Sequence, residues 1–127
     1  MPISTTSQTV YDGVRNVVMQ FTGRSDGSGQ ETNVVKVDVS ELTPSCAKVR
    51  IEKIVYDVDG GVIELLWDAQ TPVPFLELAT SGAFDYCRAP LQNGGGDTAS
   101  GDILLSTKGF ELNSSYSITI EMKKKGV

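Results

Sequence analysis

Histidine is absent from this 127-residue sequence, and cysteine occurs only twice. Without histidine the chain has no Ser-His-Asp or Cys-His nucleophile system, no imidazole metal ligand and none of the commonest general acid or base. The two thiols, Cys46 and Cys87, belong to no C-x-x-C pair and make a poor zinc site. We therefore predict a protein that is not an enzyme and that holds no metal or cofactor.

Long apolar runs and an excess of positive charge are also missing. No stretch approaches the ~18 consecutive apolar residues of a membrane-spanning helix. The net charge of −5 argues against a partner that is duplex nucleic acid, which needs Lys and Arg to replace phosphate counterions, and against an anionic membrane. The first residues show neither the basic nor the apolar region of a secretory signal, so we expect folding in a cytoplasm. In that reducing compartment two buried free thiols are favoured over a disulfide.

Glycines and prolines are frequent, and in the stretches between them apolar residues alternate with polar ones. This alternation covers residues 17–22, 35–40 and 116–123. A period of two marks half-buried strands, and the chain length fits one domain. We predict an all-β, single-domain antiparallel β-sandwich or barrel of about eight strands, with an N-terminal arm at 1–9 and the β-sandwich domain at 10–127. The predicted core consists of Val17, Met19, Val37, Val49, Ile51, Ile63, Leu65, Ile118 and Ile120.

The alternation slips in the middle of the chain. Val49 and Ile51 occupy odd positions whereas Ile54 occupies an even one, which predicts a β-bulge near Glu52 and Lys53 or two strands meeting at a bend. Turn residues at 57–61 then predict a hairpin over 49–67. Two further short strands are expected around Ser81-Gly82, one helical turn at 40–43, and a loop over 92–101.

Several motifs resemble reactive or ligand-binding sites without completing them. Residues 57–61 open like a calcium loop but lack the third ligand and the closing glutamate. The glycines at 94–101 lack the spacing of a phosphate loop, and residues 23–30 are interpreted as a mobile hairpin loop. Paired carboxylates such as Glu64 and Asp68, or Asp57 and Asp59, are common by chance among 16 acidic residues. We expect no catalysis from any of them.

Two features have open alternatives. Trp67 is favoured as a core residue, with an interface anchor as the other interpretation. The lysines at 123–125 are favoured as a solvated tail that protects the last strand, with contact to an acidic partner as the other interpretation.

Five segments resemble small virion structural proteins of tailed bacteriophages. They are LTPSCAKVRIEKIVYDV at 42–58, ELLWDA at 64–69, LQNGG at 91–95, SGDILLST at 100–107 and YSITI at 116–120 before the lysines. The resemblance implies a non-enzymatic particle component, placed best on the capsid as a decoration or cement protein. A head-tail or tail component remains an alternative, as does a carbohydrate- or protein-binding β-sandwich module.

The implied partners are the major capsid protein or other virion subunits, and further copies in a homo-oligomer. The implied location is the virion, after synthesis in the host bacterial cytoplasm. We expect contacts from the polar arm, from the proline-rich segment at 71–75 and from the basic tail. These candidate contact residues are Pro2, Ile3, Pro72, Val73, Pro74, Phe75, Lys123, Lys124 and Lys125. A sugar site would instead use exposed aromatics, for which the candidates are Tyr11, Phe75, Phe84, Tyr86 and Phe110.

Overall fold

The computed structural model describes residues 3–13, 15–27, 29–42, 46, 48–86 and 100–125. In this part of the chain seven antiparallel strands form one sheet, with one short 3-10 turn and no α-helix. The strands are β1 (Ile3–Asp12), β2 (Asn16–Ser25), β3 (Val34–Val37), β4 (Lys48–Trp67), β5 (Val73–Asp85), β6 (Ile103–Lys108) and β7 (Ser115–Lys125). The prediction of a single all-β domain is confirmed, with seven strands in place of about eight.

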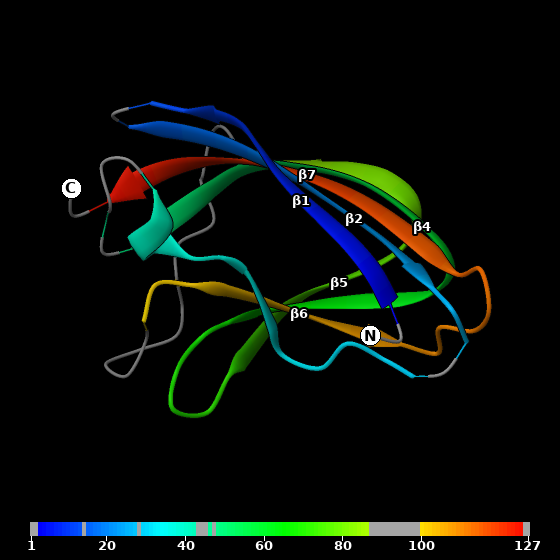
Figure 1. Ribbon diagram of the computed structural model, residues 1–127. Coiled ribbons are helices and arrows are strands. Elements are labelled where there is room, and N and C mark those ends of the chain that lie inside the picture. Colours follow the sequence, from blue (N-terminus) through cyan, green and yellow to red (C-terminus); the bar gives the residue numbers. More distant parts are fainter. Residues whose placement is uncertain are drawn as a thin grey trace.

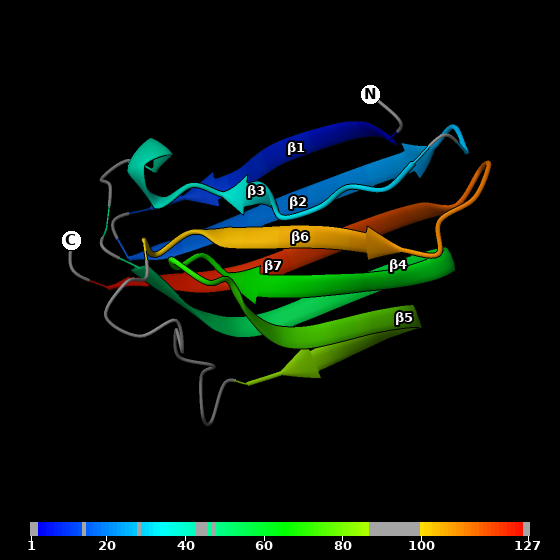
Figure 2. The ribbon, with the colours of Figure 1, turned by 90° about the horizontal axis from the view of Figure 1, so that it is seen from below.

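The sheet curls so that it packs against itself in two layers (Figure 1). Its strand order is β1-β2-β7-β4-β6-β3, and β5 pairs with β4 outside this path. The 20-residue strand β4 runs through both layers, because its residues 48–59 pair with β7 and its residues 62–67 pair with β6. Figure 2 shows the second layer from its outer side, with β3, β6, the second half of β4 and β5 in order.

The hairpin predicted over 49–67 is therefore wrong. Gly60 has a φ of +85°, and at this point β4 folds over from one layer into the other. Its two halves run in opposite directions but pair with β7 and β6, and not with each other as a hairpin would require. Strand β5 follows both halves of β4 around the corner, from Trp67 opposite Val73 to Lys53 opposite Asp85. The β-bulge predicted near Glu52 and Lys53 is confirmed by the register shift between Ile51 and Lys53.

Strand β5 is also longer than the two short strands predicted for its sequence. Gly82 lies inside the strand, opposite Tyr56, and is not part of a turn. A Cβ atom at this position would lie 2.9 Å from the hydroxyl oxygen of Tyr56. The glycine thus makes room for a neighbouring ring, and the bend of β5 falls at Thr80, whose φ is +60°.

The core lies between the two layers. All nine predicted core residues are buried, and Trp67 is only 2% exposed, which confirms its favoured interpretation as a core residue. Along β3 the prediction fails at one position, since Val35 is exposed while Lys36 is buried, and the register shifts between Val35 and Val37. The predicted helical turn is found as the 3-10 turn Val39–Glu41, where the Asp38 carboxylate accepts a hydrogen bond from the backbone N–H of Ser40.

Both predicted tails belong to the sheet. Strand β1 pairs with β2 from Ile3 to Asp12, so the boundary expected between residues 9 and 10 falls inside a strand and the expected arm is wrong from Ile3 onward. An edge strand needs only backbone pairing on one side, which a Ser- and Thr-rich segment supplies without apolar alternation. Likewise β7 continues through Lys125, so the three lysines form its last positions and not a solvated tail.

Candidate functional site

An open groove of about 630 Å³ lies where β4 turns its corner. Three strands supply hydrogen-bonding side chains to it. They are Asp57 and Asp59 from β4, Thr80 and Ser81 from β5, and Ser115 and Ser117 from β7.

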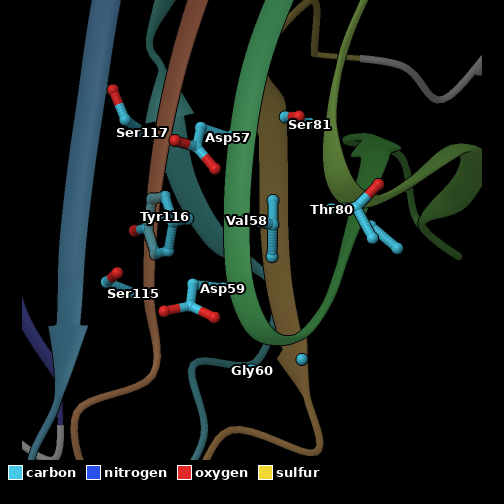
Figure 3. Close-up of a pocket in the computed structure, with 11 residues that line it drawn as sticks. Asp57, Val58, Asp59, Gly60, Thr80, Ser81, Ser115, Tyr116 and Ser117 are labelled. Atoms are coloured by element: carbon cyan, nitrogen blue, oxygen red, sulfur yellow. The ribbon is translucent and has the colours of Figure 1, made fainter.

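The strand register brings these groups together. Asp57 lies opposite both Ser117 on β7 and Ser81 on β5, and Asp59 lies opposite Ser115. Figure 3 shows each aspartate beside its serine on β7, with Ser81 on the other side of β4. The corner itself is fixed by Ser114, whose hydroxyl donates a 3.0 Å hydrogen bond to the carbonyl oxygen of Gly60.

The polar side chains that line this groove are hydrogen-bond donors and acceptors. Carboxylates accept and hydroxyls both donate and accept, as a neutral polyol would require. Apart from the buried Tyr116, no aromatic residue lines the groove within the described residues. In the same residues, no group of three or more Asp, Glu, Cys or His side chains is placed to hold a metal ion.

A second polar cluster is buried between the layers. The Glu31 carboxylate forms a 2.9 Å ion pair with the Lys36 ammonium, and both side chains are 5% exposed. Tyr116 donates a 2.7 Å hydrogen bond to the other carboxylate oxygen of Glu31. Burial raises the pKa of Tyr116, and the hydrogen bond to Glu31 and its negative charge raise it further. The phenol therefore stays protonated, and the cluster is a fixed structural connection.

Neighbouring hydrogen bonds anchor the segment that carries Glu31. The side chain of Gln30 donates a 2.7 Å hydrogen bond to the carbonyl oxygen of Phe110 and accepts one of 2.9 Å from the hydroxyl of Thr107. The backbone N–H of Glu31 donates to the same Thr107 hydroxyl. The loop expected over 23–30 is wrong at its start, because residues up to Ser25 belong to β2, while Gln30 lies outside the strands as predicted.

The proline-rich segment at 71–75, expected to contact a partner, is partly buried in the domain. Val73, Pro74 and Phe75 begin β5, and the Phe75 ring stacks on Trp67 at a centroid distance of 4.0 Å and an interplanar angle of 15°. Pro72, Val73 and Phe75 are half-buried, whereas Pro74 is exposed. Of the four candidate contact residues in this segment, Pro74 alone is exposed.

The lysines at 123–125, expected as partner contacts, differ in their exposure and in their ion pairs. Lys123 is exposed, with its ammonium 3.6 Å from a Glu52 carboxylate oxygen. Lys124 has a fully buried side chain that forms a 2.5 Å ion pair with Asp12 at the end of β1. Lys124 as a partner contact is therefore a wrong prediction, because its charge is neutralised inside the domain. Lys125 ends β7, Ile3 begins β1, and Pro2 lies outside the described residues.

The aromatic candidates for a sugar site are not gathered in the groove. Phe110 is 4% exposed, and Phe84 stacks between Tyr56 and Tyr86 at centroid distances of 5.8 and 6.1 Å. Tyr11 belongs to β1. Cys46 is half-buried against the core and Cys87 lies outside the described residues, so the thiol state stays a prediction. The loop expected at 92–101 also lies outside them, except for Ser100 and Gly101.

Sequence reasoning missed Glu31, Lys36 and Asp12 as members of buried ion pairs. The one signal in the sequence was a lysine at a position of β3 flanked by valines, Val35-Lys36-Val37. Within the described residues, no helix has the length and apolar character needed to cross a membrane. No protein-family model matches the chain, and no curated protein matches it significantly.

Proposed function

We propose that this protein is a non-enzymatic structural component of a tailed-phage virion, a decoration or cement protein that stabilises the head shell. The sequence resemblance over 42–58, 64–69, 91–95, 100–107 and 116–120 supports this role. The observation that carries it is the sheet edge at β1, which pairs with β2 alone among the strands of the described residues. This strand is ten residues long, lies at the end of the sheet and has no charged residue from Ile3 to Tyr11.

An open edge suits assembly because a neighbouring chain can add a strand through backbone hydrogen bonds. A cement protein repeats one interface many times over a shell, so modest affinity per copy becomes high avidity. The partners are the major capsid protein or other virion subunits, together with further copies of this chain. The net charge of −5 keeps a densely coated particle in solution.

Reconstitution on particles tests this function. Particles produced without the protein are mixed with purified protein, and the number of bound copies and the temperature of capsid disruption are measured. We expect saturable binding over the whole shell and a higher disruption temperature. Binding limited to the tail vertex would indicate the head-tail alternative, and an absence of binding would contradict the virion role.

The groove at the β4 corner favours one other candidate, a carbohydrate-binding module. Its aspartates and serines offer hydrogen bonds to sugar hydroxyls. Titration with host-surface polysaccharide fragments tests it, using Asp57→Asn as the matched variant. Binding that weakens about tenfold or more in Asp57→Asn would support this candidate, since a hydrogen bond to a charged group is worth ~1.5–3 kcal/mol.

A further inference from the structure

In the part of the chain that the structure describes, the sheet has three edges, and they differ in their protection against pairing with another chain. Strand β3 is only four residues long. Strand β5 carries Pro74, which lacks an N–H donor, and the charged residues Glu77 and Asp85. Short strands, prolines and edge charges are the usual obstacles to edge-to-edge pairing. Strand β1 has none of them from Ile3 to Tyr11, and its bulge near Tyr11 leaves residues 3–9 regular.

The hydrogen bonds around β2 show which backbone groups of β1 point to the open edge. The N–H of Gly13 donates to the carbonyl oxygen of Asn16, so even-numbered residues of β2 bond to β1. The bonds on the other side of β2 lead toward β7. The N–H of Ser25 donates to the carbonyl oxygen of Ser114, and the N–H of Lys124 on β7 donates to the carbonyl oxygen of Arg15. Odd-numbered residues of β2 therefore bond to β7.

This alternation divides β1 into two sets of residues. Thr6 and Gln8 lie opposite Thr22 and Gln20, so their N–H and C=O groups bond to β2. The other set lies opposite odd-numbered residues of β2 and directs its N–H and C=O groups away from the sheet. Its members are Ile3, Thr5, Ser7 and Thr9. In the described part of the chain β1 pairs with β2 alone, so these outward groups face no other strand.

We propose that β1 pairs antiparallel with β1 of a second copy around a two-fold axis at Thr6. This register places Ile3 opposite Thr9 and Thr5 opposite Ser7, so every outward residue meets an outward partner. Each such pair exchanges two backbone hydrogen bonds. Residues 3–9 of the two copies carry no charge, so no like charges face each other across the junction even though each chain has a net charge of −5. Two sheets then become one continuous sheet, with an isologous interface.

This inference deepens the proposed structural role and rests on it for its biological purpose. A two-fold dimer presents every docking surface twice, which lets one unit bind two neighbouring capsid subunits. The occupant of the edge is a second copy of this chain, and pairing with a capsid strand is one outcome of the test.

The test compares four proteins by sedimentation velocity over a range of concentrations and by thermal melting. The wild type should form a dimer of the 13.6 kDa chain. Ser7→Pro removes one outward N–H without touching the β1–β2 bonds and should weaken dimerisation by about tenfold or more while remaining folded. Ser7→Ala keeps the N–H and should dimerise like the wild type. Thr6→Pro removes an N–H that bonds to β2 and should lower the melting temperature.

Amide exchange of the wild type, followed by nuclear magnetic resonance, tests the same pairing without a variant. The amides of Thr5, Ser7 and Thr9 should gain protection as the concentration rises, while those of Thr6 and Gln8 are protected throughout. A wild type that stays monomeric at high concentration, or a dimer that folded Ser7→Pro leaves intact, would overturn the inference.

Particle binding separates the inference from the proposed function. A monomer that coats particles through β1 would show that a capsid strand occupies the edge, and the self-pairing would be wrong. A dimer that binds no particle would uphold the self-pairing and contradict the virion role.

Discussion

The hydroxyl of Tyr116 on β7 lies 2.7 Å from a carboxylate oxygen of Glu31, a residue of the segment that leads into β3. This hydrogen bond connects the two layers of the sheet, because β7 and β3 lie in different layers. Lys36 completes the cluster, with its ammonium 5.9 Å from the centre of the Tyr116 ring. A buried carboxylate needs such partners, since burial of an unpaired charge is strongly unfavourable.

Tyr116→Phe should destabilise the fold by ~1–3 kcal/mol, because it leaves a buried carboxylate oxygen without its donor. The free energy of unfolding is measured by denaturant titration. Tyr56→Phe is the matched control, since Tyr56 is half-buried, and it should cost less. Equal losses in the two variants would contradict a special role for the Tyr116 hydroxyl.

Lys36→Met should cost ~3–5 kcal/mol, because it leaves the Glu31 charge buried without its counter-ion. Adding Glu31→Gln in the same chain should recover much of this loss, since no charge then remains in the cluster. Denaturant titration of the two single variants and the double variant gives the coupling energy. If the loss of unfolding free energy in the double variant equals the sum of the two single losses, the two side chains do not interact.

Asp102→Asn should stabilise the protein at neutral pH. Burial raises the pKa of Asp102, the charges of Asp38 and Asp68 raise it further, and the hydrogen bond from Val39 lowers it in part. A carboxyl with a raised pKa in the folded state favours folding while protonated, and this contribution is lost as the pH rises through that pKa.

The melting temperature of Asp102→Asn should therefore exceed that of the wild type at pH 7, and the two should converge below about pH 4. The asparagine oxygen can still accept the 3.0 Å hydrogen bond from the N–H of Val39. Asp102→Ala loses this acceptor and should be less stable than Asp102→Asn at every pH. A wild type that is the more stable protein at pH 7 would refute the assignment.

Ile118→Ala should cost ~2–5 kcal/mol, because Ile118 is fully buried and its truncation leaves a cavity between the layers. Thr119→Ala, at the next position of β7, is half-buried and should cost much less. A loss below ~1 kcal/mol for Ile118→Ala would show that the layers collapse around the missing atoms.

The sequence pattern predicted the strands and core where one face of a strand is buried and the other is exposed. This holds for Val17, Met19 and Phe21 on β2 and for Ile118 and Ile120 on β7, all of which are buried. Alternation reports burial of one face, and these central strands bury one face along their whole length.

The same reasoning failed where pairing is decided far along the chain. Asp59-Gly60-Gly61 has the composition of a hairpin turn, but β5 pairs with both sides of it and holds β4 in a corner. Lys124 belongs to a basic run, yet Asp12 lies beside it because β1 and β7 both flank β2. Neither partner is close in sequence, so local composition carried no information about them.

The proposed virion role and the proposed pairing of β1 are tested together by electron cryomicroscopy of phage particles assembled in cells that express this protein. We expect copies of this domain at regular positions on the shell, each with a strand of a neighbouring copy beside β1. Particles that carry no copy, or copies whose β1 edge faces solvent, would contradict it.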